Sequence, residues 1–182
     1  MRWDELFSDL ETQWEAQVRR ELDAEVADRT RRERAAIALA DRLAVQGGRV
    51  VGVVLIDGTL LNGQVQEVGQ GWLLLSVVTG SCLVPVAAVA GITGLERGAG
   101  VPTPGRSFGL GYALRGLSRD RVAVTVVDVS GGVSTGTIDG VGRDFLELSE
   151  HPADLPRRRE NVTGTRAVPF AAVVLVRAAS SR

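Results

Sequence analysis

Hydrophobic residues at the start of the chain recur every three or four positions, as they do on one face of a helix. This apolar stripe consists of Trp3, Phe7, Leu10, Trp14, Val18 and Leu22. Charged residues interrupt the pattern over residues 28–34, and the pattern resumes at Ile37 before Gly47 and Gly48 end it. We therefore predict a helical segment over residues 1–46 whose apolar stripe is buried against another surface.

This helical segment can form one helix or two. Thr30 followed by Glu33 has the spacing of a capping box, which would start a second helix near residue 30. A single helix over residues 3–46 would be about 65 Å long at ~1.5 Å per residue, which is longer than a small domain is wide. The segment therefore either folds back or meets another chain, and the sequence leaves both arrangements open.

After Gly48 the period changes to the alternation typical of β-strands. Short apolar runs separated by glycine-containing turns predict five strands over residues 50–95, with Asp57 and Gly58 in the first turn. A second set of strands follows over residues 122–176. Residues 96–106, which are rich in Gly and Pro, are predicted to link the two sets.

The two sets of strands repeat the same residue types at the same steps. Gly63, Val65, Gly69, Trp72 and Leu75 return as Gly136, Ile138, Gly142, Phe145 and Leu148, and Val84, Pro85, Ala88 and Val89 return as Val168, Pro169, Ala172 and Val173. The loop between these two groups is eleven residues longer in the second copy. The repetition predicts a duplicated unit, and its mid-strand glycines predict strands that bend where no side chain fits.

Each copy resembles the Sm-like fold, in which a helix precedes five bent strands that close into a small barrel, and SH3-like barrels share this pattern. The resemblance is carried by Asp57, Gly58, Gly63, residues 72–75 and 84–92 in the first copy, and by Gly131, Gly136, residues 145–148 and 168–176 in the second. It implies an α+β, mainly β chain with a helical segment (1–46), a first five-stranded barrel (47–95), a linker (96–106) and a second five-stranded barrel with a short leading helix (107–182). Two barrels in tandem could pair their exposed edge strands with each other.

The Sm-like resemblance also implies binding of single-stranded RNA. The formal net charge of −1 gives no general attraction to nucleic acid, so local patches would have to supply it. The candidate RNA-binding residues are Arg143, Arg157, Arg158 and Arg159. Only 4% of the residues are aromatic, which leaves few rings for base stacking, and we expect Trp72 and Phe145 in the core.

Residues 132–136 match the G-x-S-x-G pattern of serine hydrolases, and Ser134 is followed by Asp139 or Asp144 and then by His151. That chemistry needs a turn from a strand into a helix, whereas the predicted context here is a hairpin. A serine hydrolase is therefore only a remote alternative, and we predict neither enzymatic activity nor catalytic residues. One His and one Cys are too few for a transition-metal site, so we predict no metal and no cofactor.

We predict a non-catalytic interaction or scaffold protein. Its helical segment would bind a protein partner or a second copy through Trp3, Phe7, Leu10 and Trp14, since Trp is enriched at interfaces. An RNA-binding regulator of Sm-like type is the alternative. A cytoplasmic location is expected because the single Cys82 cannot form an internal disulfide, and no membrane contact is expected because no stretch approaches ~18 uncharged apolar residues.

Overall fold

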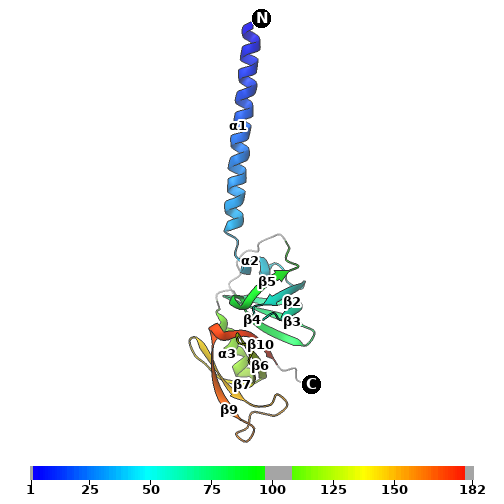
Figure 1. The fold of residues 1–182 in the computed structure, drawn as a ribbon, viewed down its shortest axis with the longest axis vertical. Coiled ribbons are helices and arrows are strands. Elements are labelled where there is room, and N and C mark those ends of the chain that lie inside the picture. The colour runs from blue at the N-terminus through cyan, green and yellow to red at the C-terminus, as the bar shows by residue number, and fades with distance from the viewer. Residues whose placement is uncertain (1, 97–107, 179–182) are drawn as a thin grey trace. The chain divides into compact units, whose positions relative to one another are not determined.

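The computed structural model describes residues 2–96 and 108–178, except for the side chains of residues 2–12, 15 and 16. The chain divides into two compact units, residues 1–38 and residues 39–182. The first contains one long helix, and the second contains all the strands (Figure 1). We describe each unit by itself.

Helix α1 runs without a break from Arg2 to Ala35. The Thr30 hydroxyl donates back to the Val26 carbonyl at 2.8 Å, a bond that a Thr inside a helix makes, so Thr30 does not cap a new helix. The second helix, α2 (Leu39–Ala44), belongs to the other unit, where Leu43 is completely buried. The helical segment is therefore two helices, and the interruption falls after Ala35.

Within the described residues, the strands form one antiparallel sheet of ten strands in the order β5-β1-β2-β3-β4-β10-β6-β7-β8-β9. In the first half these are β1 (Val50–Leu55), β2 (Leu60–Gly69), β3 (Trp72–Val77), β4 (Gly80–Pro85) and β5 (Val89–Thr93), and in the second half β6 (Ala123–Asp128), β7 (Val133–Val141), β8 (Phe145–Glu150), β9 (Gly164–Pro169) and β10 (Val173–Ala178). Helix α3 (Leu110–Asp120) precedes β6. A 3-10 turn precedes the last strand of each half, at Val86–Ala88 and Phe170–Ala172.

The prediction of two separate five-stranded barrels is wrong, because β4 of the first half pairs with β10 of the second. Val176 lies opposite Leu83 and Arg177 lies opposite Cys82. An isolated set of five strands would leave the backbone N–H and C=O groups of these two edges without partners. Pairing the edges merges the two sets into one open sheet.

The hydrophobic core also crosses this junction. Trp72 of β3 and Leu83 of β4 pack with the second half, in a cluster that includes Leu114 and Leu148. In exchange, Leu175 of β10 packs in the core of the first half. Trp72 is buried as predicted, but in the core of the opposite half. Each half therefore completes the core of the other.

The two halves nevertheless repeat the same local geometry. The pairing of β2 with β3 shifts register after Val65, and that of β7 with β8 shifts after Ile138, the residue that corresponds to Val65 in the repeat. The mid-strand glycines confirm the expected lack of room. A Cβ added at Gly63 would lie 2.5 Å from the Ser76 carbonyl oxygen, and one added at Gly136 would lie 2.0 Å from that of Ser149.

Candidate functional site

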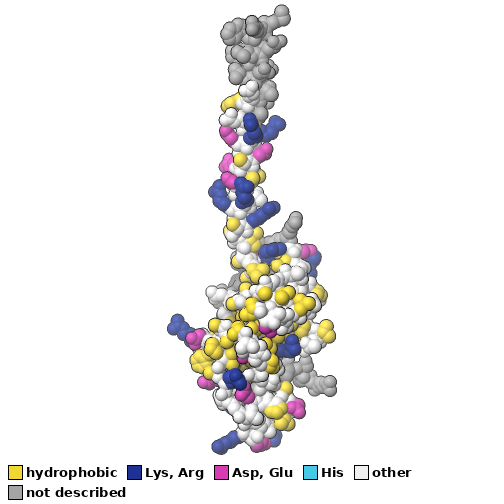
Figure 2. Space-filling model, in the orientation of Figure 1, with side chains coloured by type: hydrophobic (Ala, Val, Ile, Leu, Met, Phe, Trp, Pro, Cys, Tyr) yellow, Lys and Arg dark blue, Asp and Glu magenta, His cyan; other side chains and the backbone are white. Residues whose placement is uncertain are grey.

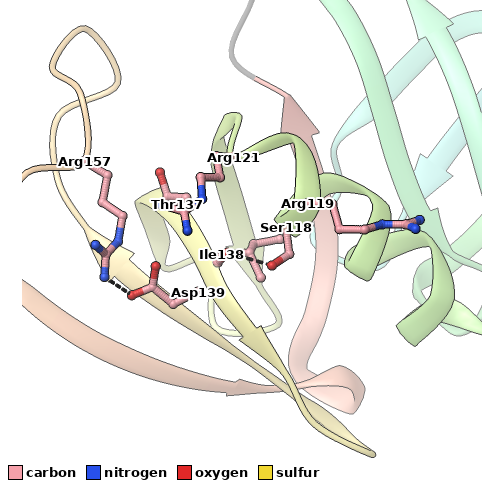
Figure 3. Close-up of a pocket in the computed structure, with 7 residues that line it drawn as sticks. All are labelled: Ser118, Arg119, Arg121, Thr137, Ile138, Asp139 and Arg157. Carbon is pink, nitrogen blue, oxygen red and sulfur yellow. Dashed lines mark hydrogen bonds and ion pairs between the residues drawn. The ribbon is translucent and has the colours of Figure 1, made fainter.

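An open groove runs between α3 and β7 on the surface of the second half. It consists of two adjoining hollows of about 320 and 390 Å³, which share Ser118, Arg119 and Asp139. Tyr112 and Arg115 line one hollow, and Arg121, Thr137 and Arg157 line the other (Figure 3). Four arginines and one carboxylate thus line this groove.

A buried side chain and a hydrogen bond help to hold helix α3 against β7. Leu114 is completely buried in the core of the second half. The Ser118 hydroxyl donates to the Ile138 carbonyl of β7 at 3.0 Å. The helix ends at Arg121, whose left-handed backbone (φ 50°) terminates it as a C-cap residue usually does. These contacts fix Arg115, Arg119 and Arg121 along one wall of the groove.

Asp139 of β7 is the hub of the hydrogen bonds in the groove. It accepts hydrogen bonds from the Ser149 hydroxyl of β8 and from the Arg157 guanidinium, which reaches back from the loop between β8 and β9 (Figure 3). Burial alone would raise the pKa of Asp139, but the hydrogen bonds from Arg157 and Ser149, together with the charges of Arg157 and Arg121, outweigh it and lower the pKa. The same hydrogen bond raises the pKa of Arg157.

Asp139 forms an ion pair with only one of the four arginines, Arg157. Among the described residues, neither the Arg119 guanidinium nor the Arg121 guanidinium has a hydrogen-bond or ion-pair partner, and that of Arg115 makes only a 3.5 Å hydrogen bond to the Gly142 carbonyl. In Figure 3 the guanidinium of Arg119 points away from Asp139 and Arg157. The α3 wall therefore offers cations to an anionic ligand, while Asp139 and Arg157 satisfy each other.

The Asp139 hydrogen bonds predict a specific pH dependence. Because the folded-state pKa lies below the unfolded one, their stabilisation is present above the unfolded pKa and is lost as the pH falls through the folded pKa. We expect Asp139→Asn to lower the free energy of unfolding by about 1 kcal/mol at neutral pH, after allowance for solvent exposure. The difference in unfolding free energy between this variant and the wild type should shrink below pH ~3.9, the ordinary pKa of an Asp side chain. Urea unfolding across this pH range measures it.

Asp154→Asn is the matched control, because Asp154 is an exposed carboxyl in the loop between β8 and β9. This variant should unfold at the wild-type urea midpoint at every pH. A difference between Asp139→Asn and the wild type that stays constant down to low pH would contradict the role of the ionised carboxylate.

The structure does not bring the four predicted RNA-binding arginines together. Arg157 is paired with Asp139, and Arg158 lies 3.8 Å from Glu160. Arg143 follows β7 and precedes β8, whereas the loop with the other three follows the far end of β8. The predicted site residues did not include Arg115, Arg119 and Arg121. The spacing of four residues between Arg115 and Arg119, which places them on one face of a helix near Tyr112, could have indicated this wall of the groove.

The residues of the hydrolase motif also have other partners. The His151 ring is buried, its Nδ1 donates to the Pro152 carbonyl, and its Nε2 shares a 2.8 Å hydrogen bond with the Thr137 hydroxyl. Asp139 accepts hydrogen bonds from Ser149 and Arg157. Ser134 lies in β7 and is buried. Among the described residues, no hydrogen bond joins Ser134 to His151, and both His151 and Asp139 are hydrogen-bonded to other partners.

The predicted partner-binding residues lie on α1. Trp14 is 71% exposed, and the apolar positions that follow it, Leu22 and Val26, are 57% and 63% exposed. Figure 2 shows hydrophobic side chains among charged ones along the described part of the helix. The side chains of Trp3, Phe7 and Leu10 lie outside the described residues. A hydrophobic stripe is therefore available on α1 from Trp14 to Val26.

Comparisons of the chain with protein-family models, with curated proteins and with solved structures found no match. Within residues 2–96 and 108–178, no group of three or more His, Cys, Asp and Glu side chains could hold a metal ion. Across the same residues, the helices are too short or too polar to cross a membrane.

Proposed function

We propose that this chain is a non-catalytic interaction protein in which α1 recruits a helical partner and the sheet unit is the folded body attached to it. The observation that carries this proposal is the apolar stripe of Trp14, Val18, Leu22 and Val26 on a helix that forms a unit of its own. Burying a large apolar side chain is worth about 1.5–3 kcal/mol, so covering this stripe would stabilise a complex.

The spacing of the stripe supports a helical partner. Its members are four residues apart, so they form a continuous ridge along the helix, and such ridges pack into the grooves of another helix. Helices of this kind gain most of their stability in water from packing rather than from propensity. A partner that covers Trp14 and Leu22 would supply that packing, and Trp is frequent among the residues that dominate binding energy.

Substitution of two stripe residues tests the proposal in the full chain. We expect Trp14→Glu with Leu22→Glu to abolish association, because two carboxylates would have to be buried in the interface. Light scattering would measure self-association against the 19.3 kDa chain mass, and affinity capture from the native cells would measure a partner. The double variant should lose whichever association the wild type shows.

Ala27→Glu is the matched control. Ala27 is exposed and follows Val18 by nine residues, which places it on the opposite side of the helix at about 100° per residue. It adds the same charge without touching the stripe and should associate as the wild type does. A wild-type chain that is monomeric and captures nothing, or a double variant that associates normally, would contradict the proposal.

An RNA-binding regulator is the second candidate, and one observation favours it. The rings of Phe108 and Tyr112 stack at 4.2 Å between centroids, and both are about half exposed next to the cations of the α3 groove. Exposed rings beside arginines are typical of surfaces that bind single strands. This arrangement supports the RNA binding that the Sm-like resemblance implies.

A salt titration of single-stranded RNA binding tests this candidate. We expect Arg115→Ala with Arg119→Ala to weaken binding at low salt and to reduce its salt dependence, since each phosphate contact contributes to the salt slope. Arg49→Ala is the control, because Arg49 is exposed, lies outside the groove and is not among the candidate RNA-binding residues. Wild-type protein that retains no RNA at low salt would eliminate this function.

Two further assignments belong to the proposal. The Sm-like relationship is supported by the common strand order of the two halves and by their matching glycines and register shifts. A cytoplasmic location is supported by the single cysteine, Cys82, which is buried and unpaired.

A further inference from the structure

The apolar stripe of α1 is symmetric about Val18. Stripe residues stand four and eight positions before Val18, and again four and eight positions after it. They are Leu10, Trp14, Leu22 and Val26. The middle of the stripe, together with Arg19, lines an open hollow of about 400 Å³ on the helix. Holes between the side chains of one helix receive side chains of a facing helix, so the centre of the stripe is shaped for helix packing.

The charges of α1 change sign about the same residue. Residues 2–9 contain one Arg and three acidic residues, which gives a formal net charge of −2, whereas residues 27–34 contain four Arg and two acidic residues, which gives +2. The two segments lie at equal distances before and after Val18 on one unbroken helix. A copy of α1 turned end for end therefore presents apolar residues to apolar residues and positive charge to negative charge.

The basic end of α1 keeps two cations without a counter-charge on the same helix. The two acidic residues of this end form ion pairs with two of its four arginines. Among the described residues, the side chains of the other two, Arg32 and Arg34, have no hydrogen-bond or ion-pair partner, and both are exposed. They are therefore available to an acidic segment of another chain.

We propose that α1 pairs with α1 of a second copy of this chain, antiparallel and with the two-fold axis at Val18. This inference rests on the proposed function, in which α1 recruits a helical partner, and it identifies that partner. A two-fold interface brings the same surface of both copies together, so that surface has to be complementary to itself. The arrangement of the stripe and of the charges about Val18 meets this requirement.

The symmetry also fixes the register and the direction of the pair. Val18 faces Val18 of the second copy, Trp14 of each helix faces Leu22 of the other, and residues 2–9 lie beside residues 27–34. A parallel pair would place the two −2 segments side by side and the two +2 segments side by side. Like charges repel and opposite charges attract, so the charged ends select the antiparallel direction. The apolar centre supplies the affinity.

Disulfide capture in the full chain tests both the pairing and its direction. Positions 11 and 25 lie about two turns before and after Val18, on its side of the helix, so they face each other in the antiparallel pair. Helix axes about 8–10 Å apart bring facing Cα atoms to roughly 4–6 Å, which a disulfide can span. An oxidised mixture of Glu11→Cys and Glu25→Cys should therefore give a covalent dimer of twice the 19.3 kDa chain mass.

The controls isolate this contact from every other association. Each variant alone should give no dimer, because position 11 of one copy lies about 21 Å along the axis from position 11 of the other. A mixture of Asp9→Cys and Ala27→Cys is the matched control, since both positions lie nine residues from Val18 and hence on the opposite side of the helix. This mixture should give no dimer. The native Cys82 is completely buried, so the wild type should give none either.

Two outcomes would overturn the inference. The first is a mixture of Glu11→Cys and Glu25→Cys that gives no more dimer than the mixture of Asp9→Cys and Ala27→Cys. The second is a dimer formed by Glu11→Cys alone or by Glu25→Cys alone, which would show parallel helices. A chain that gives no dimer but captures another protein through the stripe would refute the pairing of two copies and leave the proposed function standing, so the two failures are distinguishable.

Discussion

Gly136→Ala is expected to lower the free energy of unfolding by about 3 kcal/mol, at the upper end of the usual cost of overpacking. The added Cβ would lie 2.0 Å from the Ser149 carbonyl oxygen and 2.8 Å from its carbonyl carbon. Both atoms belong to the backbone of β8, so no side chain can rotate away to make room. The strands β7 and β8 would have to separate at the point where Gly136 faces Glu150.

Gly116→Ala is the matched control in the same half of the sheet unit. A Cβ at Gly116 meets nothing within 4 Å, and Gly116 lies inside α3, where alanine is favoured over glycine by up to ~1 kcal/mol. This variant should be as stable as the wild type or more so. Urea unfolding followed by circular dichroism compares the two, and a wild-type midpoint for Gly136→Ala would refute the close approach of β7 and β8.

Trp72→Ala is expected to cost about 4 kcal/mol of unfolding free energy, as large-to-small substitutions of buried aromatic residues do. Trp72 is only 3% exposed, and its Nε1 donates to the Phe108 carbonyl at 2.8 Å. The ring belongs to the first half but packs in the core of the second. Its removal should therefore loosen the contact between the halves as well as leave a cavity.

Trp72→Phe separates the contribution of the Trp72 hydrogen bond from that of the packing of its ring. Phenylalanine keeps an aromatic ring in the core but cannot donate a hydrogen bond to the Phe108 carbonyl. Beyond the cost of its smaller volume, this variant should therefore lose only about 1 kcal/mol of unfolding free energy. Val78→Ala, at a fully exposed turn position, should change stability by less than ~0.5 kcal/mol. A Trp72→Ala protein with wild-type stability would contradict the shared core.

The local features of the fold could be read from single segments of sequence. The stripe from Trp3 to Leu22 predicted a helix, and the Asp57-Gly58 turn and the mid-strand glycines predicted short, bent strands. These features are local, because they depend on the backbone angles of a few neighbouring residues and on the side on which each side chain lies. The candidate site was predicted less well, because Arg115, Arg119 and Arg121 form a groove only when α3 packs on β7.

The sequence by itself determined the periodicity, the turns, the repeated spacings and the positions where only glycine fits. Only the tertiary structure decided that β4 pairs with β10, that Trp72 enters the core of the opposite half and that Arg157 turns back to Asp139. The reason is that strand edges and core positions are matched across long stretches of chain, and many different partners satisfy the same local pattern of hydrophobic and polar residues.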